Sequence, residues 1–172
     1  MFRKATLTDL DVISSIYDAV HDREEAGLSI TGWVRSIYPT LATVRLGLCS
    51  GDLFVLEQER RIVAAARINQ AQGEEYKQVR WSFNADDSKV MVLHTLAVHP
   101  ECFGQGFGTD FVAFYEDYAA QQGCTCLRMD TNVRNTAART LYKKLGYAEA
   151  GVVPCTFNGI DGVQLVCLEK RL

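Results

Sequence analysis

The chain has 172 residues, of which 48% are hydrophobic and 23% charged, and its formal net charge is -3 at pH 7. This composition is typical of a soluble globular protein with a sizeable core, and we expect a single domain over residues 1–172. The negative charge argues against nucleic-acid binding, which usually requires a basic surface. No segment has the apolar length of a membrane span and the first residues lack a signal-peptide pattern, so we expect a cytoplasmic protein that contacts no membrane.

Cysteine and histidine usage excludes the familiar metal centres. The six cysteines form no Cys-x-x-Cys pair and the chain has only three histidines, so no zinc-site spacing is present. The sequence therefore predicts reduced thiols and no bound metal.

The first half of the chain reads as a strand, two helices and a hairpin. We expect an edge strand at residues 2–5, and then a helix that begins at the capping pattern of residues 8–11. Its apolar face consists of Ile13, Ile16, Tyr17 and Val20. Charged residues 21–26 indicate a mobile loop, followed by a second helix at residues 40–48. Apolar runs at residues 52–58 and 61–69 predict an antiparallel hairpin, and polar residues 70–88 predict a long connection.

The most informative segment joins a buried strand, residues 90–98, to a glycine-rich turn and a helix. Gly104, Gly106 and Gly108 alternate, so little side-chain bulk shields the backbone N–H groups of the turn. The positive end of the following helix points to the same place, which favours an anionic ligand such as a phosphate. The alternative is a glycine-rich surface loop without a ligand, because a glycine cluster alone is a weak signal.

The remaining elements follow from periodicity. The helix after the turn has an aromatic face, and we expect it to end near residue 122. A buried strand follows at residues 124–131, and then a helix at residues 135–145 that Gly146 terminates. Two strands close the chain at residues 147–155 and 163–170, joined by the turn at residues 158–162.

Two motifs resemble the GNAT superfamily of acyl-CoA-dependent N-acetyltransferases. The first is Leu96-Ala-Val-His-Pro-Glu before Gly-Gln-Gly-Phe-Gly, and the second is Asn135-x-x-Ala138-x-x-x-Tyr142-x-x-Leu145-Gly-Tyr. The resemblance covers nearly the whole chain. It implies an α/β (α+β) fold with a mixed central sheet of about six to seven strands, about four flanking helices and a splayed central strand pair. It also implies direct transfer of an acetyl group from acetyl-CoA to a primary amine of a small molecule or peptide, by a monomer or homodimer.

The resemblance assigns the acetyl-CoA contacts. The pyrophosphate would lie over the turn formed by Phe103, Gly104, Gln105, Gly106, Phe107, Gly108 and Thr109. The pantetheine arm would pair with the strand at Leu96, Ala97 and Val98 and contact Asn135 and Ala138. The family usually has Arg or Gln where this chain has Phe103, but the backbone N–H groups that hold the phosphates are unaffected by that change.

Two residues are candidates for the chemistry. By resemblance, Tyr142 would protonate the departing thiolate, whereas its helical spacing alone fits a core aromatic. His94 has an ordinary pKa of about 6.5, which suits a base that removes the proton of the amine, and the alternative is a core histidine. Glu74 and Glu75 are looser candidates for the base. Asp130 ends a strand and either orients water or substrate or caps the following turn.

Two other functions compete with acetyl transfer. A non-catalytic acyl-CoA sensor would keep the cofactor cleft, and Phe103 together with the unassigned base is consistent with it. A dinucleotide-dependent oxidoreductase would explain the glycines at 104, 106 and 108, but its fingerprint requires glycine at position 109, where this chain has threonine.

Overall fold

A computed structural model describes residues 1–172 as one mixed sheet with helices on both faces. The seven strands lie in the order β1-β2-β3-β4-β5-β7-β6. They are β1 (Phe2–Lys4), β2 (Leu53–Gln58), β3 (Arg61–Asn69), β4 (Val90–Val98), β5 (Cys126–Asn132), β6 (Ala148–Phe157) and β7 (Ile160–Arg171). The four α-helices are α1 (Leu10–Glu25), α2 (Leu41–Ser50), α3 (Phe107–Gln121) and α4 (Thr136–Lys144). This arrangement confirms the predicted mixed sheet and its four flanking helices.

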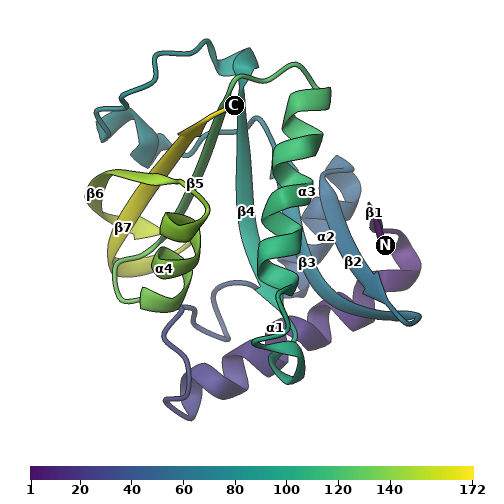
Figure 1. The fold of residues 1–172 in the computed structure, drawn as a ribbon. Helices are drawn as coiled ribbons and strands as arrows, with labels where there is room; N and C mark the ends of the chain where they lie inside the picture. The colour runs from purple at the N-terminus through teal and green to yellow at the C-terminus, as the bar shows by residue number, and fades with distance from the viewer.

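The helices form two layers, one on each face of the sheet (Figure 1). On one face, Phe111 and Tyr115 of α3 and Tyr142 of α4 pack against alternate residues of the central strands. On the other face, α1 and α2 cover β2 and β3. The connection at residues 70–89 covers the rest of that second face, where Tyr76 is only 3% exposed. It contains two short 3-10 helices, Glu74–Gln78 and Asp87–Lys89, and contributes Tyr76 and Val79 to the core.

The central strands β4 and β5 separate halfway along their length. They pair in parallel only from Val90 with Cys126 to Leu93 with Met129. Beyond that point β4 stays paired with β3 up to Val98, and β5 stays paired with β7 up to Asn132. Figure 1 shows the two strands close together at the top of the view and diverging below it. The expected splayed pair is present, and it opens the sheet between its two halves.

Helix α1 is longer than the sequence indicates. We expected residues 21–26 to form a mobile loop, but the helix continues to Glu25. His21 faces inward and is 1% exposed, while the acidic residues lie on the outer side of the helix. There Asp22 and Glu25 contact Arg35 at 2.5 and 2.8 Å. The charged residues are therefore the solvated face of a helix, and they attach the loop that follows it, residues 27–40.

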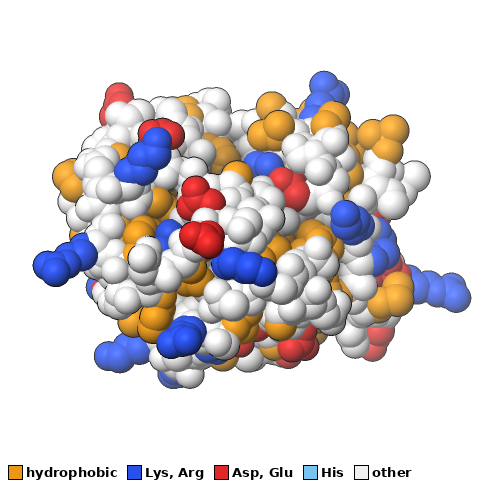
Figure 2. Space-filling view, turned by 90° about the horizontal axis from the view of Figure 1, so that it is seen from above, with side chains coloured by type: hydrophobic (Ala, Val, Ile, Leu, Met, Phe, Trp, Pro, Cys, Tyr) orange, Lys and Arg blue, Asp and Glu red, His pale blue; other side chains and the backbone are white.

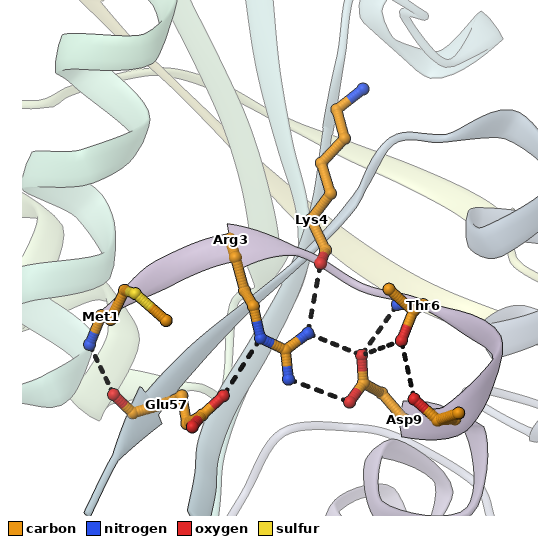
Figure 3. Close-up of polar contacts among 7 residues, drawn as sticks. Met1, Arg3, Lys4, Thr6, Asp9 and Glu57 are labelled. Carbon is orange, nitrogen blue, oxygen red and sulfur yellow. Dashed lines mark hydrogen bonds and ion pairs between the residues drawn. The ribbon is translucent and has the colours of Figure 1, made fainter. Parts of the chain in front are cut away.

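A polar cluster joins the N-terminal strand to the start of α1 (Figure 3). The guanidinium of Arg3 donates two hydrogen bonds to the Asp9 carboxylate, at 2.7 and 3.0 Å, and a third to Glu57 at 3.0 Å. The backbone N–H of Thr6 also donates to Asp9 at 2.8 Å. Asp9 is 6% exposed, and these donors lower its pKa to about 2. The cluster fixes the edge strand β1 on β2.

The surface carries both signs of charge. Figure 2 shows Lys and Arg side chains scattered over one face among Asp and Glu, with small hydrophobic groups between them. None of the helices is long and apolar enough to cross a lipid bilayer.

Candidate active site

A bulge in β4 lies at the point where the two central strands separate. The register between β3 and β4 shifts between Ala65 and Arg67, and the opposing Thr95 has a φ of 53°. A β-branched residue rarely adopts this left-handed conformation, so the surrounding contacts must maintain it. One of them is a hydrogen bond between the Thr95 and Tyr38 hydroxyls, which ties the loop after α1 to the bulge.

The glycine-rich turn presents a row of free backbone donors. Gly104 and Gly106 have φ values of 77° and 90°, and a Cβ at either position would meet no other atom within 4 Å. No backbone N–H from Gly104 to Thr109 donates to an acceptor within the protein. Helix α3 begins immediately after Gly106, so its positive end adds to these donors. This turn, residues 103–109, has the geometry that suits an anionic ligand, and we call it the amide cradle.

Three residues of the amide cradle make contacts away from its backbone N–H groups. Phe103 is 45% exposed, and the Arg23 guanidinium carbon lies 5.4 Å from the centre of its ring. Gln105 turns back to donate to the Glu101 carbonyl at 3.2 Å. The side chains at positions 103 and 105 therefore leave the backbone N–H groups accessible. At Gly108 a Cβ would lie 3.3 Å from Leu141, so glycine there permits close packing of α3 on α4.

A cavity of about 640 Å³ fills the opening between β4 and β5. Its size suits a small-molecule ligand. Its lining includes Trp33 and Tyr38 of the loop after α1 and Asn158 of the turn between β6 and β7. Of the residues that the sequence analysis singled out, the lining contains Glu75, His94, Leu96, Asp130, Asn135, Ala138 and Tyr142. Ala97 and Val98 lie further along β4, between the cavity and the amide cradle.

His94 lies at the edge of the cavity in a network of polar side chains. Its Nε2 is 3.0 Å from the Asn69 side-chain oxygen, and Asn69 donates in turn to Asp52 at 2.6 Å. Asp52 also accepts two hydrogen bonds from Arg67, at 2.9 and 2.7 Å. Burial, together with the positive charge of Arg67, lowers the pKa of His94 to about 4. The imidazole is therefore neutral at pH 7 but a weaker base than its ordinary pKa indicates.

Asp130 also lines the cavity, and its pKa is shifted in the direction opposite to that of His94. Burial raises the pKa of its carboxyl group to about 6, and the negative charge of Glu75 adds to this effect. The Tyr76 hydroxyl donates a hydrogen bond to Asp130 Oδ2 at 2.8 Å, which partly offsets the rise. Asp130 does not cap the following turn, because the Asn132 side chain accepts the N–H of Arg134 there. Of the two roles considered for Asp130, the capping role is wrong.

The remaining acidic candidates separate clearly. Glu75 lines the cavity and has no ion-pair partner, whereas Glu74 is exposed and paired with Lys77 at 2.6 Å. Of these two glutamates, Glu75 is therefore the one positioned to act on a ligand in the cavity.

Tyr142 presents its ring from α4 to the cavity. It is 6% exposed and packs edge-on against Tyr147, with ring centres 6.1 Å apart. Burial raises the pKa of its phenol, so the hydroxyl remains protonated and can act as a donor. Asn135 caps the same helix by accepting the N–H of Ala138 at 3.2 Å, which leaves its amide NH₂ group for another partner. Tyr142 therefore packs against Tyr147 and also lines the cavity, so a role in packing does not prevent a role in the chemistry.

The sequence alone does not indicate Tyr76, Thr95 or the Arg67 network. Tyr76 lies in a polar stretch without periodicity, and no motif indicates a bulge at Thr95. The one available signal was the pair of charged residues at Asp52 and Arg67, on the two strands of the expected hairpin.

Comparison with known proteins extends these observations. Residues 17–147 match the model of the acetyltransferase (GNAT) family. The chain is 36% identical over 61 residues to the uncharacterized N-acetyltransferase YhfO of Bacillus subtilis, covering 36% of this chain and 41% of that protein. It is 30% identical over 78 residues to an uncharacterized N-acetyltransferase of Methanocaldococcus jannaschii, covering 45% of this chain and 49% of the relative. The matched segments thus span less than half the length of these curated relatives.

Solved structures share the fold over nearly the whole chain. A GNAT-family acetyltransferase from Streptococcus agalactiae superposes with a TM-score of 0.82 at 20% identity, covering 100% of this chain and 95% of that one. The ribosomal-protein-alanine N-acetyltransferase of Brucella melitensis gives 0.72 at 20% identity, covering 100% and 99%. The yncA protein of Salmonella typhimurium, solved with its cofactor acetyl-CoA, gives 0.68 at 19% identity, covering 100% and 93%.

These matches agree with the mixed seven-stranded sheet and its four helices. The family model covers most of the chain, and the structural neighbours reproduce its whole fold. The chain belongs to the GNAT family of acetyltransferases.

Proposed function

We propose that this protein transfers an acetyl group from acetyl-CoA to a primary amine of a small molecule or peptide. The observation that carries the proposal is the continuity of β4, which runs from the cavity at Leu96 to the amide cradle that follows Val98. One extended ligand with an anionic end and a reactive end fits this path. The residues that line the cavity would then act on the amine and on the thioester at the reactive end.

The amide cradle suits the pyrophosphate of acetyl-CoA. Its N–H groups from Gly104 to Thr109 are free, and both Gly104 and Gly106 leave open space above the backbone. Beyond Leu93 the edge of β4 that faces β5 has no partner strand. The backbone groups of Leu96, Ala97 and Val98 on this edge are therefore available to pair with an extended arm. We propose that Asn135 and Ala138, which line the cavity, contact the same arm.

The acceptor amine must lose a proton before it attacks the thioester. An alkyl ammonium has a pKa of about 10.4, so very little of it is neutral at pH 7. A base is most effective when its pKa lies close to the working pH. With values of about 6 and about 4, Asp130 meets this condition better than His94. We therefore propose Asp130 as the proton acceptor, and keep His94 as the alternative that the pH profile must exclude.

We propose that Tyr142 assists the departure of CoA. As the nitrogen–carbon bond forms, the carbon–sulfur bond breaks and the sulfur gains negative charge. The Tyr142 phenol is protonated, because burial raises its pKa, and it faces the cavity. Its hydroxyl can therefore give the departing thiolate a proton.

The proposal is tested by binding and by turnover. Acetyl-CoA at 100 times its dissociation constant should stabilise the protein by about 2.7 kcal/mol, which a thermal shift detects, while NADH serves as the control ligand. Release of free CoA is then measured with amino acids, polyamines, aminoglycosides, arylalkylamines and peptide amino termini. Amine-dependent release supports the transferase, whereas binding without release from any amine would indicate an acyl-CoA sensor. Stabilisation by NADH alone would indicate an oxidoreductase.

We also propose that the protein works in the cytoplasm. All six cysteines are free, and four of them are buried as thiols within the fold. Such thiols persist in a reducing compartment. Cell fractionation with an antibody to the protein tests this location.

A further inference from the structure

We propose that Arg128 and Glu169 are positioning residues: they hold residues 70–85 against the sheet so that the Tyr76 hydroxyl fixes the Asp130 carboxylate in the cavity. This inference rests on the proposed function, in which Asp130 accepts the proton of the amine. It assigns a role to two buried charges that lie outside the cavity.

Arg128 and Glu169 are neighbours on the adjacent strands β5 and β7. They are opposite each other in the β5–β7 register and are 6% and 1% exposed. Asp130 is two residues beyond Arg128 on β5, so both side chains lie on the same face of the sheet. That is the face that residues 70–89 cover. Charges buried this deeply require polar partners, and the connection supplies them to the Glu169 carboxylate and to the two terminal nitrogens of Arg128.

The partners of Glu169 are backbone groups. Its carboxylate accepts the N–H of Ser82 at 2.7 Å and the N–H of Phe83 at 3.2 Å. Hydrogen bonds between a carboxylate and backbone N–H groups are among the stronger kinds. Glu169 therefore fixes the path of the main chain at these two residues.

Arg128 holds the same stretch from the neighbouring strand. Its guanidinium donates to the Phe83 carbonyl at 3.3 Å and to the side chain of Gln72. The guanidinium carbon also lies 4.0 Å from the centre of the Trp81 ring, a cation–π contact. Arg128 thus contacts the connection both at Gln72 and at Trp81 and Phe83.

Trp81 transmits this anchoring to Tyr76. The indole Nε1 donates to the Tyr76 carbonyl at 3.0 Å, and the two rings pack edge to face with centres 5.2 Å apart. Tyr76 is buried and donates to Asp130 Oδ2 at 2.8 Å. An unbroken series of contacts therefore runs from Glu169 and Arg128 through Trp81 to the carboxylate in the cavity.

The position of the Tyr76 hydroxyl has an electrostatic consequence. Its hydrogen bond favours the ionised carboxylate, against the burial that raises the Asp130 pKa to about 6. The titratable groups that act on Asp130 from the surrounding elements are Glu75, Tyr76, Tyr38, Tyr142, Cys155 and Cys167. Burial raises the pKa values of the phenols and thiols in this group, so they are neutral near pH 6. Loss of the Tyr76 hydrogen bond should therefore raise the Asp130 pKa further.

The test measures the Asp130 carboxyl group directly. Its side-chain carbon is titrated by NMR in protein labelled with ¹³C-aspartate, without acetyl-CoA or amine, and the Asp130→Asn spectrum assigns the signal. Tyr76→Phe removes only the hydroxyl and should raise the midpoint by about one pH unit. Glu169→Gln, in which an amide replaces one oxygen that receives a backbone N–H, should shift the midpoint in the same direction. Trp81→Phe keeps an aromatic ring and loses the donor to Tyr76, so it serves if Glu169→Gln fails to fold.

The matched control is Glu116→Gln on α3. This substitution makes the same chemical change at a carboxylate that contacts Lys170 at 2.8 Å and no residue of the connection, so the Asp130 midpoint should stay at its wild-type value. The inference is overturned if Tyr76→Phe moves the midpoint while both Glu169→Gln and Trp81→Phe leave it unchanged. It is also overturned if Tyr76→Phe has no effect. Because these titrations use no substrate, they are independent of the proposed function, which fails only if wild-type protein transfers no acetyl group.

Discussion

His94 and Asp130 are each the first residue on their strand beyond the last β4–β5 pair, Leu93 with Met129. Both side chains line the cavity, yet burial affects them in opposite ways. It disfavours the charged form of each group, which lowers the pKa of the imidazole to about 4 and raises that of the carboxyl group to about 6. The opening of the sheet therefore contains two groups whose charged forms are disfavoured by burial, and the pKa of Asp130 is the closer of the two to pH 7.

The first prediction concerns the pH dependence of acetyl transfer. A base acts in its deprotonated form, so kcat/KM should rise with pH through the pKa of Asp130, with a midpoint near 6. Asp130→Asn should remove this limb and lower kcat/KM by about 10²- to 10⁴-fold. The measurement is the initial rate of CoA release at sub-saturating amine, between about pH 4.5 and about pH 9. This range spans the pKa of Asp130.

His94→Gln is the companion variant for this profile. It should leave the midpoint near 6 and lower the rate less than Asp130→Asn does. A limb that persists in Asp130→Asn but disappears in His94→Gln would identify the histidine as the base.

The second prediction is that Tyr142→Phe slows the chemical step. The variant keeps the ring that packs on Tyr147 and removes only the hydroxyl, so folding and acetyl-CoA affinity should be nearly unchanged. General acid catalysis typically contributes about 10²- to 10⁴-fold, so the single-turnover rate should decrease by a factor in that range. A single-turnover rate equal to that of wild type would show that Tyr142 only packs.

The third prediction concerns the amide cradle. Gly106→Val should abolish the thermal stabilisation by acetyl-CoA, because a branched side chain would occupy the open space above the backbone N–H groups. Gly51→Val is the control, since Gly51 also has a positive φ and open space but lies at the end of α2. Both variants should lose intrinsic stability through backbone strain. Only Gly106→Val should lose the response to the ligand, and retention of that response would mean that the pyrophosphate binds elsewhere.

The fourth prediction is an acid-dependent loss of stability. The donors around Asp9 lower its pKa from 3.8 to about 2, so its contribution is present above about pH 4 and is lost as the pH falls through 2. Arg3→Met should therefore lower the free energy of unfolding at pH 7 by about 2 kcal/mol, and the difference from wild type should shrink toward pH 2. Urea unfolding at several pH values measures this. Arg61→Met, which removes an exposed pair with Glu101, should change stability by less than about 1 kcal/mol.

The order of elements could be predicted because local patterns determine it. Hydrophobic runs and helical spacing indicated the strands and the four α-helices, and glycines marked the amide cradle and the end of α4. Most of the errors were at element ends. Strand β7 begins at Ile160, three residues before the expected start, because pairing with β6 extends it into the turn. Helix α1 continues past His21 because a charged stretch can be the outer face of a helix.

The candidate site was predictable only where a single motif carries it. The amide cradle and Tyr142 lie within contiguous patterns, so the family resemblance could indicate them. Tyr76 and Asp130 are far apart in the chain, and only the packing of residues 70–89 on the sheet brings them together. The pKa values of His94 and Asp130 depend on burial, which the sequence alone does not provide.

The bulge at Thr95 also reverses the alternation of side chains along β4. Before it, the odd-numbered residues Met91 and Leu93 face α3, whereas after it the even-numbered Leu96 and Val98 do. Ala97 correspondingly turns toward α1. Deletion of Thr95 would therefore exchange the two faces for every residue that follows in the strand. A change in length at this one position would therefore turn Leu96 and Val98 away from α3, in the part of the strand that leads to the amide cradle.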